Sequence, residues 1–308
     1  MRWMSLWKCG LVWMVLACSA GAEVPFGGPT PVEFKHYWYS DGAEISRYKL
    51  TQSRYGELHT GDAVLLFVTE SLRSDVQVKA DNPSDADLPV LKLNEQRKFY
   101  TGVYPYSIMT SVFSPIAEGK QARPAKISTS VQEWCGHVYV QMNLRDEAYN
   151  VKGFSYFESE VEEDLSVPAN VTEDGLFNLV RLAPQTLPIG TFDLVVGTVF
   201  SRLRHTPLAP TPAIGTLQAI AGASLEGNPL VRYRVEMPDY RRTLSIVFER
   251  DFPHRIERWD DTCPGSGGGR GKMLTTSAVR SHTIKSPYWQ HHSNRDRSLL
   301  KKLGLEPR

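Results

Sequence analysis

Cysteine is scarce in this 308-residue chain, which has only four, and neither sign of charge dominates, because 35 Lys and Arg face 34 Asp and Glu. The near-neutral balance excludes a protein whose whole surface binds nucleic acid. The sequence also lacks an H-E-x-x-H zinc motif. Its nearest approach to a phosphate loop, SGGGRGKM, has Ser266 and Met273 where Gly and Ser or Thr are needed. We therefore expect no nucleotide, metal or other cofactor.

Long apolar runs are missing as well. The stretch CGLVWMVLA at 9–17 is too short to span a bilayer, which takes about 20 residues. It follows a basic start and precedes small residues, which is the pattern of an export signal over residues 1–22. Cleavage before Glu23 fits an A-x-A site, whereas VLAC resembles a lipoprotein sequence ending at Cys18. We expect an exported protein of the periplasm or outer envelope, either free or held as a peripheral membrane protein by a lipid on Cys18.

The abundant feature is a β-strand pattern. Short alternating apolar runs are separated by frequent turn signals, which is typical of antiparallel strands rather than βαβ units. Behind a Pro- and Gly-rich linker at 23–31, we predict a mainly β domain over 32–261. Its expected form is a curved antiparallel sheet or incompletely closed barrel, similar to the lipoprotein-carrier (LolA-like) fold. We interpret FKHYWYS at 34–40 as a strand, and the helix candidates are 172–183 and 293–305.

A basic C-terminal tail at 273–308 is predicted after a glycine-rich connector at 262–272. Residues 270–308 contain nine Lys or Arg and two acids, although the whole chain has a net charge of only +1, so the rest is acidic. The tail should therefore dock on the body, which we favour, or bind an anionic surface such as lipid headgroups. Ser293 should cap its short helix, whose apolar stripe contains Leu299, Leu300 and Leu303.

The stretch STSVQEWCGHVYVQMN at 128–143 is the one most suggestive of chemistry. Interpreted as one extended strand, it places Trp134 on a core face and Cys135 and His137 on the other, about 7 Å apart. That spacing is too long for a direct hydrogen bond and awkward for two ligands of one metal ion. We expect a sheet face. A thiol- or metal-dependent enzyme or redox protein using Cys135 and His137 is the alternative, and a disulfide between Cys135 and Cys263 is a further possibility.

Tyrosine and tryptophan gather in a few short stretches, HYWY, FYTGVYPY, FSYF and SPYW among them. These side chains suit surfaces with one apolar and one wet side. They could line a site for an apolar or carbohydrate ligand, although aromatic residues also favour strands in general. The candidate ligand contacts are Tyr37, Trp38, Tyr104, Tyr106 and Trp134.

Several long phrases are together similar to a family of exported bacterial proteins of unestablished function. They are YWYSDGAEISRYKLTQSRYGELHTGDAVLLFVTE, SVQEWCGHVYVQMN, FPHRIERW and KMLTTSAVRSHTIKSPYW with LLKKLGL. Members of that family are sometimes labelled "septum formation inhibitor Maf", but this chain has no Maf phosphate motif. The resemblance implies export and supplies no catalytic residue.

The expected function is therefore that of an extracytoplasmic, non-catalytic β protein. Its ligand would be an apolar molecule in the concavity of the sheet, or the envelope itself. A structural envelope lipoprotein is the second alternative, beside the enzyme.

Overall fold

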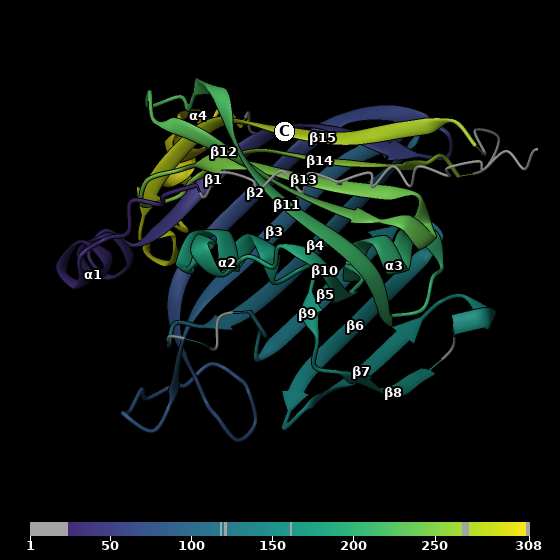
Figure 1. Ribbon diagram of the computed structural model, residues 1–308, viewed down its shortest axis with the longest axis horizontal. Helices are drawn as coiled ribbons and strands as arrows, with labels where there is room; N and C mark the ends of the chain where they lie inside the picture. The colour runs from purple at the N-terminus through teal and green to yellow at the C-terminus, as the bar shows by residue number, and fades with distance from the viewer. Residues whose placement is uncertain (1–23, 118, 120–121, 161, 267–270, 306–308) are drawn as a thin grey trace, which may run out of the picture.

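One curved sheet of fifteen strands forms most of the molecule (Figure 1). The computed structural model describes residues 24–117, 119, 122–160, 162–266 and 271–305, so the predicted export signal and Cys18 lie outside the described residues. Strands make up 56% and helices 16% of the structure, and the sheet is not closed. The predicted class, a mainly β protein with a curved open sheet, is confirmed.

The sheet is a meander with two halves, which meet where the first strand, β1, pairs with the last strand, β15. From β1, eight strands follow one another to one edge, and from β15 the order runs back to β9 at the other edge. All pairs are antiparallel except β9–β10. The first half comprises β1 (Ala43–Arg54), β2 (Glu57–Leu72), β3 (Leu88–Thr101), β4 (Tyr104–Pro115), β5 (Lys126–Glu133), β6 (Gly136–Arg145), β7 (Ala148–Ser155) and β8 (Glu162–Pro168). The second comprises β9 (Val171–Thr172), β10 (Gly190–Val195), β11 (Pro210–Ala223), β12 (Pro229–Met237), β13 (Arg242–Glu249), β14 (Ile256–Pro264) and β15 (Met273–Ser286).

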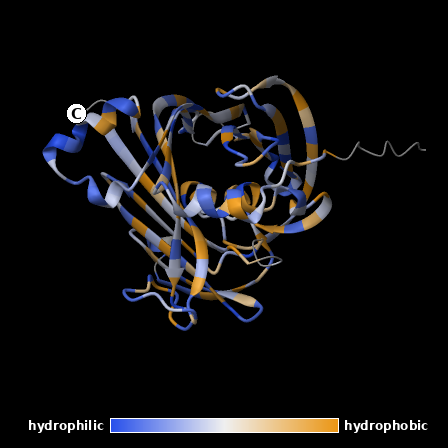
Figure 2. Ribbon diagram, turned by 90° about the vertical axis from the view of Figure 1, so that its left-hand side faces the viewer, coloured by the Kyte–Doolittle hydropathy of each residue, from blue (hydrophilic) through white to orange (hydrophobic). Residues whose placement is uncertain are grey.

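Two short helices, α2 (Leu176–Leu182) and α3 (Thr198–Arg204), lie inside the curve of the sheet (Figures 1 and 2). Six of the seven residues of each helix are buried. The helix predicted at 172–183 is confirmed. By contrast, the apolar stretch TFDLVVGTVF at 191–200 is not a strand throughout, because β10 ends at Val195 and α3 begins three residues later. The acids before α2 hold the start of α3, since Glu173 and Asp174 accept the backbone N–H groups of Gly197 and Thr198 at 2.9 Å.

The interior of the curve is filled by side chains. Two cavities among the described interior residues measure about 40 Å³ and 20 Å³, which is room for water and not for a lipid chain. The helices α2 and α3 pack against strands of both halves of the sheet, in one apolar core. Neither of these two cavities has space for the apolar ligand expected from the sequence.

The aromatic segment expected as a strand at 34–40 is instead helix α1 (Pro31–Tyr39). Thr30 and Glu33 form a capping box, and Pro31 occupies the first turn, so the local sequence starts a helix despite its aromatic content. The helix covers the end of β2, where Trp38 is 3% exposed and packs against Phe67.

The predicted boundary at residue 273 is wrong, because β15 is a central strand between β1 and β14. The glycine-rich connector joins β14 to β15, and alternating residues of β15 are buried in the manner of a strand with a core face. Only residues 287–305 leave the sheet. We name them the C-terminal strap; it contains three short helical turns, η5 (Tyr288–Gln290), η6 (Asn294–Arg297) and α4 (Ser298–Lys302).

The strap folds back over the outer face of β1, β2 and β15. Ser293 forms the expected cap, and Leu303, 6% exposed, packs with Ala43, Ile45 and Val68. Docking of the C-terminal segment on the body is thus confirmed, through apolar contacts. None of the helices in the described parts of the chain has the length and apolar character to cross a membrane. The remaining helical turns are η1 (Glu158–Glu160), η2 (Pro184–Thr186) and η3 (Pro238–Tyr240).

Candidate functional site

The stretch at 128–143 is a hairpin and not one continuous strand. Glu133 of β5 pairs with Gly136 of β6, and Trp134 and Cys135 form the turn between them. Beyond the turn, Val138 and Val140 are buried and face the core. Trp134 does not: its side chain is 69% exposed. An extended strand places successive side chains on opposite faces. Because the chain reverses at residues 134 and 135, this alternation of faces does not continue through the turn.

Cys135 is exposed on this turn. Its backbone N–H donates to Glu133 Oε2 at 2.8 Å, and a hydrogen bond to the Glu133 carboxylate, with its charge, raises the pKa of the Cys135 thiol above its ordinary value. A raised pKa reduces the thiolate fraction on which nucleophilic or metal-binding chemistry depends. No hydrogen bond joins Cys135 to His137 in the described part of the chain, so the geometry does not support the enzyme alternative.

Cys263 lies elsewhere, buried on β14. Arg204 Nη2 donates to its sulfur at 2.7 Å, and burial raises the pKa of the thiol. Both cysteines are free. The disulfide considered from the sequence is therefore not formed, because the two thiols occupy different surroundings, one exposed and one buried.

Three of the five candidate ligand contacts do come together. Tyr104 stacks on Trp134 with ring centroids 6.1 Å apart, and Tyr104 lies 5.7 Å from the Tyr106 ring. Sequence reasoning missed a fourth member, Tyr55, whose hydroxyl bonds those of Tyr106 at 2.7 Å and Tyr104 at 3.1 Å. The Arg54 guanidinium lies 4.3 Å from the Tyr55 ring centre. The result is an aromatic cluster with a polar fringe at the ends of β1, β4 and β5.

The other two candidates, Tyr37 and Trp38, support the structure. Their rings meet edge to face at 5.0 Å, and the Tyr37 hydroxyl donates to the buried Glu44 carboxylate. Burial raises the pKa of Tyr37 well above its ordinary value, so the hydroxyl stays protonated. Neither residue belongs to the aromatic cluster of Tyr104 and Trp134.

Two buried arginines inside the sheet, Arg181 and Arg242, are matched by carboxylates. Arg181 and Glu44, each 1% exposed, form a two-pronged pair at 2.6 and 2.7 Å. Burial alone would raise the pKa of Glu44, but the charge and hydrogen bonds of Arg181 keep it below its ordinary value. Arg242 binds Glu173 and Asp261 in the same way. Such pairs hold helices α2 and α3 to the sheet. Their guanidinium groups already bind carboxylates, so they are not available to bind a ligand.

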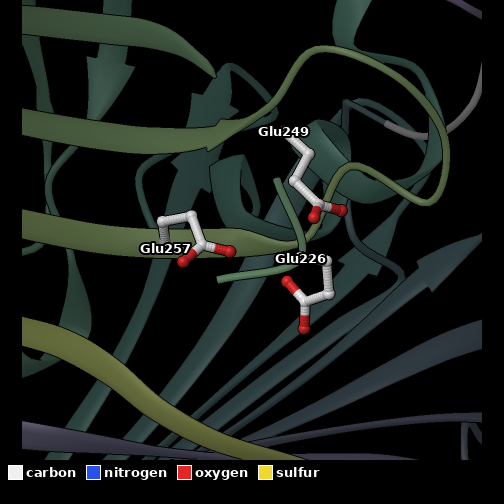
Figure 3. Close-up of side chains that lie close together, drawn as sticks. All are labelled: Glu226, Glu249 and Glu257. Carbon is white, nitrogen blue, oxygen red and sulfur yellow. The ribbon is translucent and has the colours of Figure 1, made fainter. Parts of the chain in front are cut away.

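Three carboxylates, Glu226, Glu249 and Glu257, converge at the ends of β12 to β14 (Figure 3), with an oxygen of each within 4.8 Å of the others. Arg280 contacts both Glu226 and Glu257, and Arg255 donates to Glu249 at 3.0 Å. The guanidinium groups therefore already supply the positive charge that a cation would bring, and this cluster does not indicate a metal site.

Surface grooves flank the C-terminal strap. One, of about 470 Å³, lies under the strap and is mainly apolar, with Ile45, Leu66 and Leu300 in its lining. Two others, of about 560 and 390 Å³, meet at Tyr39 and Trp289 between the strap and the end of α1. The sequence signal for this region was SPYW at 286–289, the aromatic stretch that contributed no candidate residue.

The strap carries cations that nothing in the described residues neutralises. Arg295, Arg297, Lys301 and Lys302 are exposed, and no ion pair joins any of them to a carboxylate of the described chain. The apolar docking of Leu303 thus fixes the strap while its basic side chains point to solvent. In Figure 2 the strap projects at the upper left as a largely hydrophilic segment, outside the sheet.

Comparisons with known proteins give a fold relationship at most. No family model matches the chain, and no curated protein matches it. A solved structure described as a β-barrel-like protein of a domain of unknown function, DUF1849, from Brucella abortus is similar, with a TM-score of 0.45 and 11% identity over 79% of this chain and 97% of that one.

Proposed function

We propose that the protein is a non-catalytic binding protein of the cell envelope that attaches to anionic lipid through its C-terminal strap. The observation that carries this proposal is the amphipathic character of the strap. It exposes four cations that pair with no carboxylate of the described residues, and it roofs a groove of about 470 Å³ whose lining includes Leu299, Leu300 and one of these cations, Arg297. Amphipathic segments of this kind bind at the boundary between headgroups and acyl chains.

The expected strength of binding follows from the charges. A Lys or Arg near an anionic membrane surface contributes about 1 kcal/mol, so the four cations of the strap together supply roughly 4 kcal/mol at low salt. Tyr39 and Trp289 are half exposed beside the strap, and aromatic rings of this type are favoured at the membrane interface. The groove below provides a place for part of an acyl chain.

Export and lipid attachment at Cys18 belong to the same proposal. A single acyl chain gives only marginal, reversible binding to a membrane, and stable anchoring requires a second contact. The basic strap would supply that contact. In the form without the lipid, the strap alone would give salt-sensitive, peripheral attachment.

Sedimentation with lipid vesicles tests the proposal. The purified protein should sediment with vesicles containing 30 mol% phosphatidylglycerol, a mixture chosen to give about the surface charge of an anionic leaflet. It should remain in solution with pure phosphatidylcholine. Replacing Arg295, Arg297, Lys301 and Lys302 by Glu should reduce binding at least tenfold, because attraction becomes repulsion.

A matched variant changes the same number of charges away from the strap: Lys98, Lys152, Arg232 and Lys272, all exposed, replaced by Glu. It should keep most of the binding at moderate salt. Equal loss in both variants would mean that total charge and not the strap governs attachment. No binding of the unaltered protein to anionic vesicles would overturn the proposal.

A further inference from the structure

The aromatic cluster belongs to a row of turns at one end of the sheet. In an antiparallel meander, alternate turns fall at the same end, so the turns after β1, β3, β5 and β7 share one rim. Each carries an aromatic side chain within or directly beside it, and these are Tyr55, Tyr104, Trp134 and Tyr156. The turns at the opposite end of the same strands, at 73–87, 116–125, 146–147 and 169–170, contain no aromatic residue.

The side chains of this row lean toward one another. The Tyr104 and Trp134 ring centroids are 6.1 Å apart, and the Tyr104 hydroxyl donates to that of Tyr55 at 3.1 Å. The rings are also accessible: Trp134 and Tyr156 are 69% and 67% exposed, and Tyr55 44%. Tyr156 lies over Gly136, where an added Cβ would come within 2.6 Å of its ring. The rim therefore presents exposed aromatic rings together with tyrosine hydroxyl groups.

The backbone of Tyr55 is one of six non-glycine positions with positive φ in the described residues. It adopts a left-handed backbone conformation, with φ of +52°, in the two-residue turn with Gly56, whose φ is +83°. That turn favours Asn or Asp at the first position, and a bulky residue there costs free energy. Strain of this kind is concentrated at ligand-binding positions. The tyrosine hydroxyl and Arg54 then supply donors and acceptors beside the rings.

We propose that this rim, Tyr55, Tyr104, Trp134 and Tyr156 with Arg54, binds a linear glycan. Sugar rings present an apolar face that stacks on aromatic side chains and hydroxyl edges that bond polar groups, and the rim offers both. The rim is separate from the C-terminal strap, and glycan binding is independent of attachment to lipid. A peptide strand would instead add to the sheet edges at β8 or β9, away from this row.

Calorimetric titration of the purified protein with cellohexaose and chitohexaose tests the inference. At least one hexasaccharide should bind, and its disaccharide should bind at least tenfold more weakly because it covers fewer rings. Trp134→Ala should weaken binding about tenfold, as expected for loss of one stacking ring, and Trp134→Phe should retain most of it. Trp289→Ala, on the strap, should leave glycan binding unchanged.

Tyr55→Asn separates a binding role from a structural one. Asparagine suits the turn better than tyrosine, so the midpoint of thermal unfolding should stay the same or rise while glycan binding weakens. A lowered midpoint with unaltered binding would show that Tyr55 is structural. Absence of binding by both hexasaccharides at millimolar concentration, equal affinity of Trp134→Ala, or binding of a proline-rich peptide at the rim in their place would overturn the inference.

Discussion

Positive charge occurs in two contrasting settings in this molecule, inside the sheet and on the C-terminal strap. Arg181 and Arg242 are buried, and each faces one or two carboxylates at hydrogen-bond distance. On the strap, Arg295 and Lys301 are exposed and face solvent. Buried charge must be paired where it lies, because desolvation would otherwise destabilise the fold. Exposed charge carries no such requirement. The four strap cations pair with no carboxylate of the described residues, so they are available to a partner.

The largest expected effect comes from breaking an interior pair. Arg181→Met leaves Glu44 buried without its partner, which should lower the free energy of unfolding by about 3–5 kcal/mol. Urea denaturation followed by circular dichroism measures the change. The double variant Arg181→Met with Glu44→Gln should recover a large part of the loss. If the double variant is as unstable as the single one, then packing and not charge dominates at this site.

A smaller effect is expected where the strap meets the sheet. Leu303 is buried with Ile45 and Val68 in a cluster separate from the main core, so Leu303→Ala should weaken docking of the strap by about 2–3 kcal/mol. Hydrogen exchange of the strap amides should accelerate while that of β3 and β4 is unchanged. Leu65→Ala, inside the main core, serves as the contrast and should accelerate exchange throughout the sheet. Equal protection of the strap in wild type and Leu303→Ala would contradict this.

The next effect concerns pH. Burial, with the charge of Glu173 second, raises the pKa of Asp174 from 3.8 to about 7. The folded state therefore binds more protons than the unfolded state between these values, and stability should fall as pH rises from about 4 to about 7, by at most about 1.4 kcal/mol per pH unit. His254 opposes this trend: burial lowers its pKa to about 4, so its contribution to stability falls as pH decreases from about 6.5 to about 4.

The comparison of wild type with Asp174→Asn isolates the carboxyl group from His254. Asparagine retains an oxygen for the Thr198 N–H and has no ionisation, so the variant should lose the stability that wild type gains at acid pH. Denaturation midpoints at pH 5, 6, 7 and 8 give the slopes. Parallel curves for the two proteins would show that Asp174 does not titrate in this range.

The smallest effect is expected from the strap cations themselves. Replacing Arg295, Arg297, Lys301 and Lys302 by Glu should change the free energy of unfolding by less than about 0.5 kcal/mol per site, because exposed, unpaired charges contribute little to stability. Urea denaturation of this variant, run beside Arg181→Met, makes the contrast between strap and interior quantitative. A loss comparable to that of Arg181→Met would mean that the strap cations serve the fold and leave no surplus for a partner.

The aromatic residues show where sequence reasoning succeeds and where it stops. Their density in short stretches indicated binding surfaces, and Tyr104, Tyr106 and Trp134 do gather in one place. The sequence did not reveal that Trp134 occupies a turn. Trp134, Val138 and Val140 all stand at even-numbered positions, as residues on one face of a single strand would, although the chain reverses at Trp134. It also gave no reason to include Tyr55, whose hydroxyl partners Tyr104 and Tyr106 are 49 and 51 residues away.

What the sequence alone determined is the class of structure: mainly antiparallel strands, a short helix near 172–183, and a C-terminal segment capped at Ser293. These follow from local periodicity, turn residues and caps, which act over a few residues. Only the tertiary structure decided that β15 lies between β1 and β14, that α2 and α3 fill the concavity, and that four aromatic turns share a rim. Those features depend on pairing between segments far apart in the chain, and local physics does not specify which partner a strand or helix will meet.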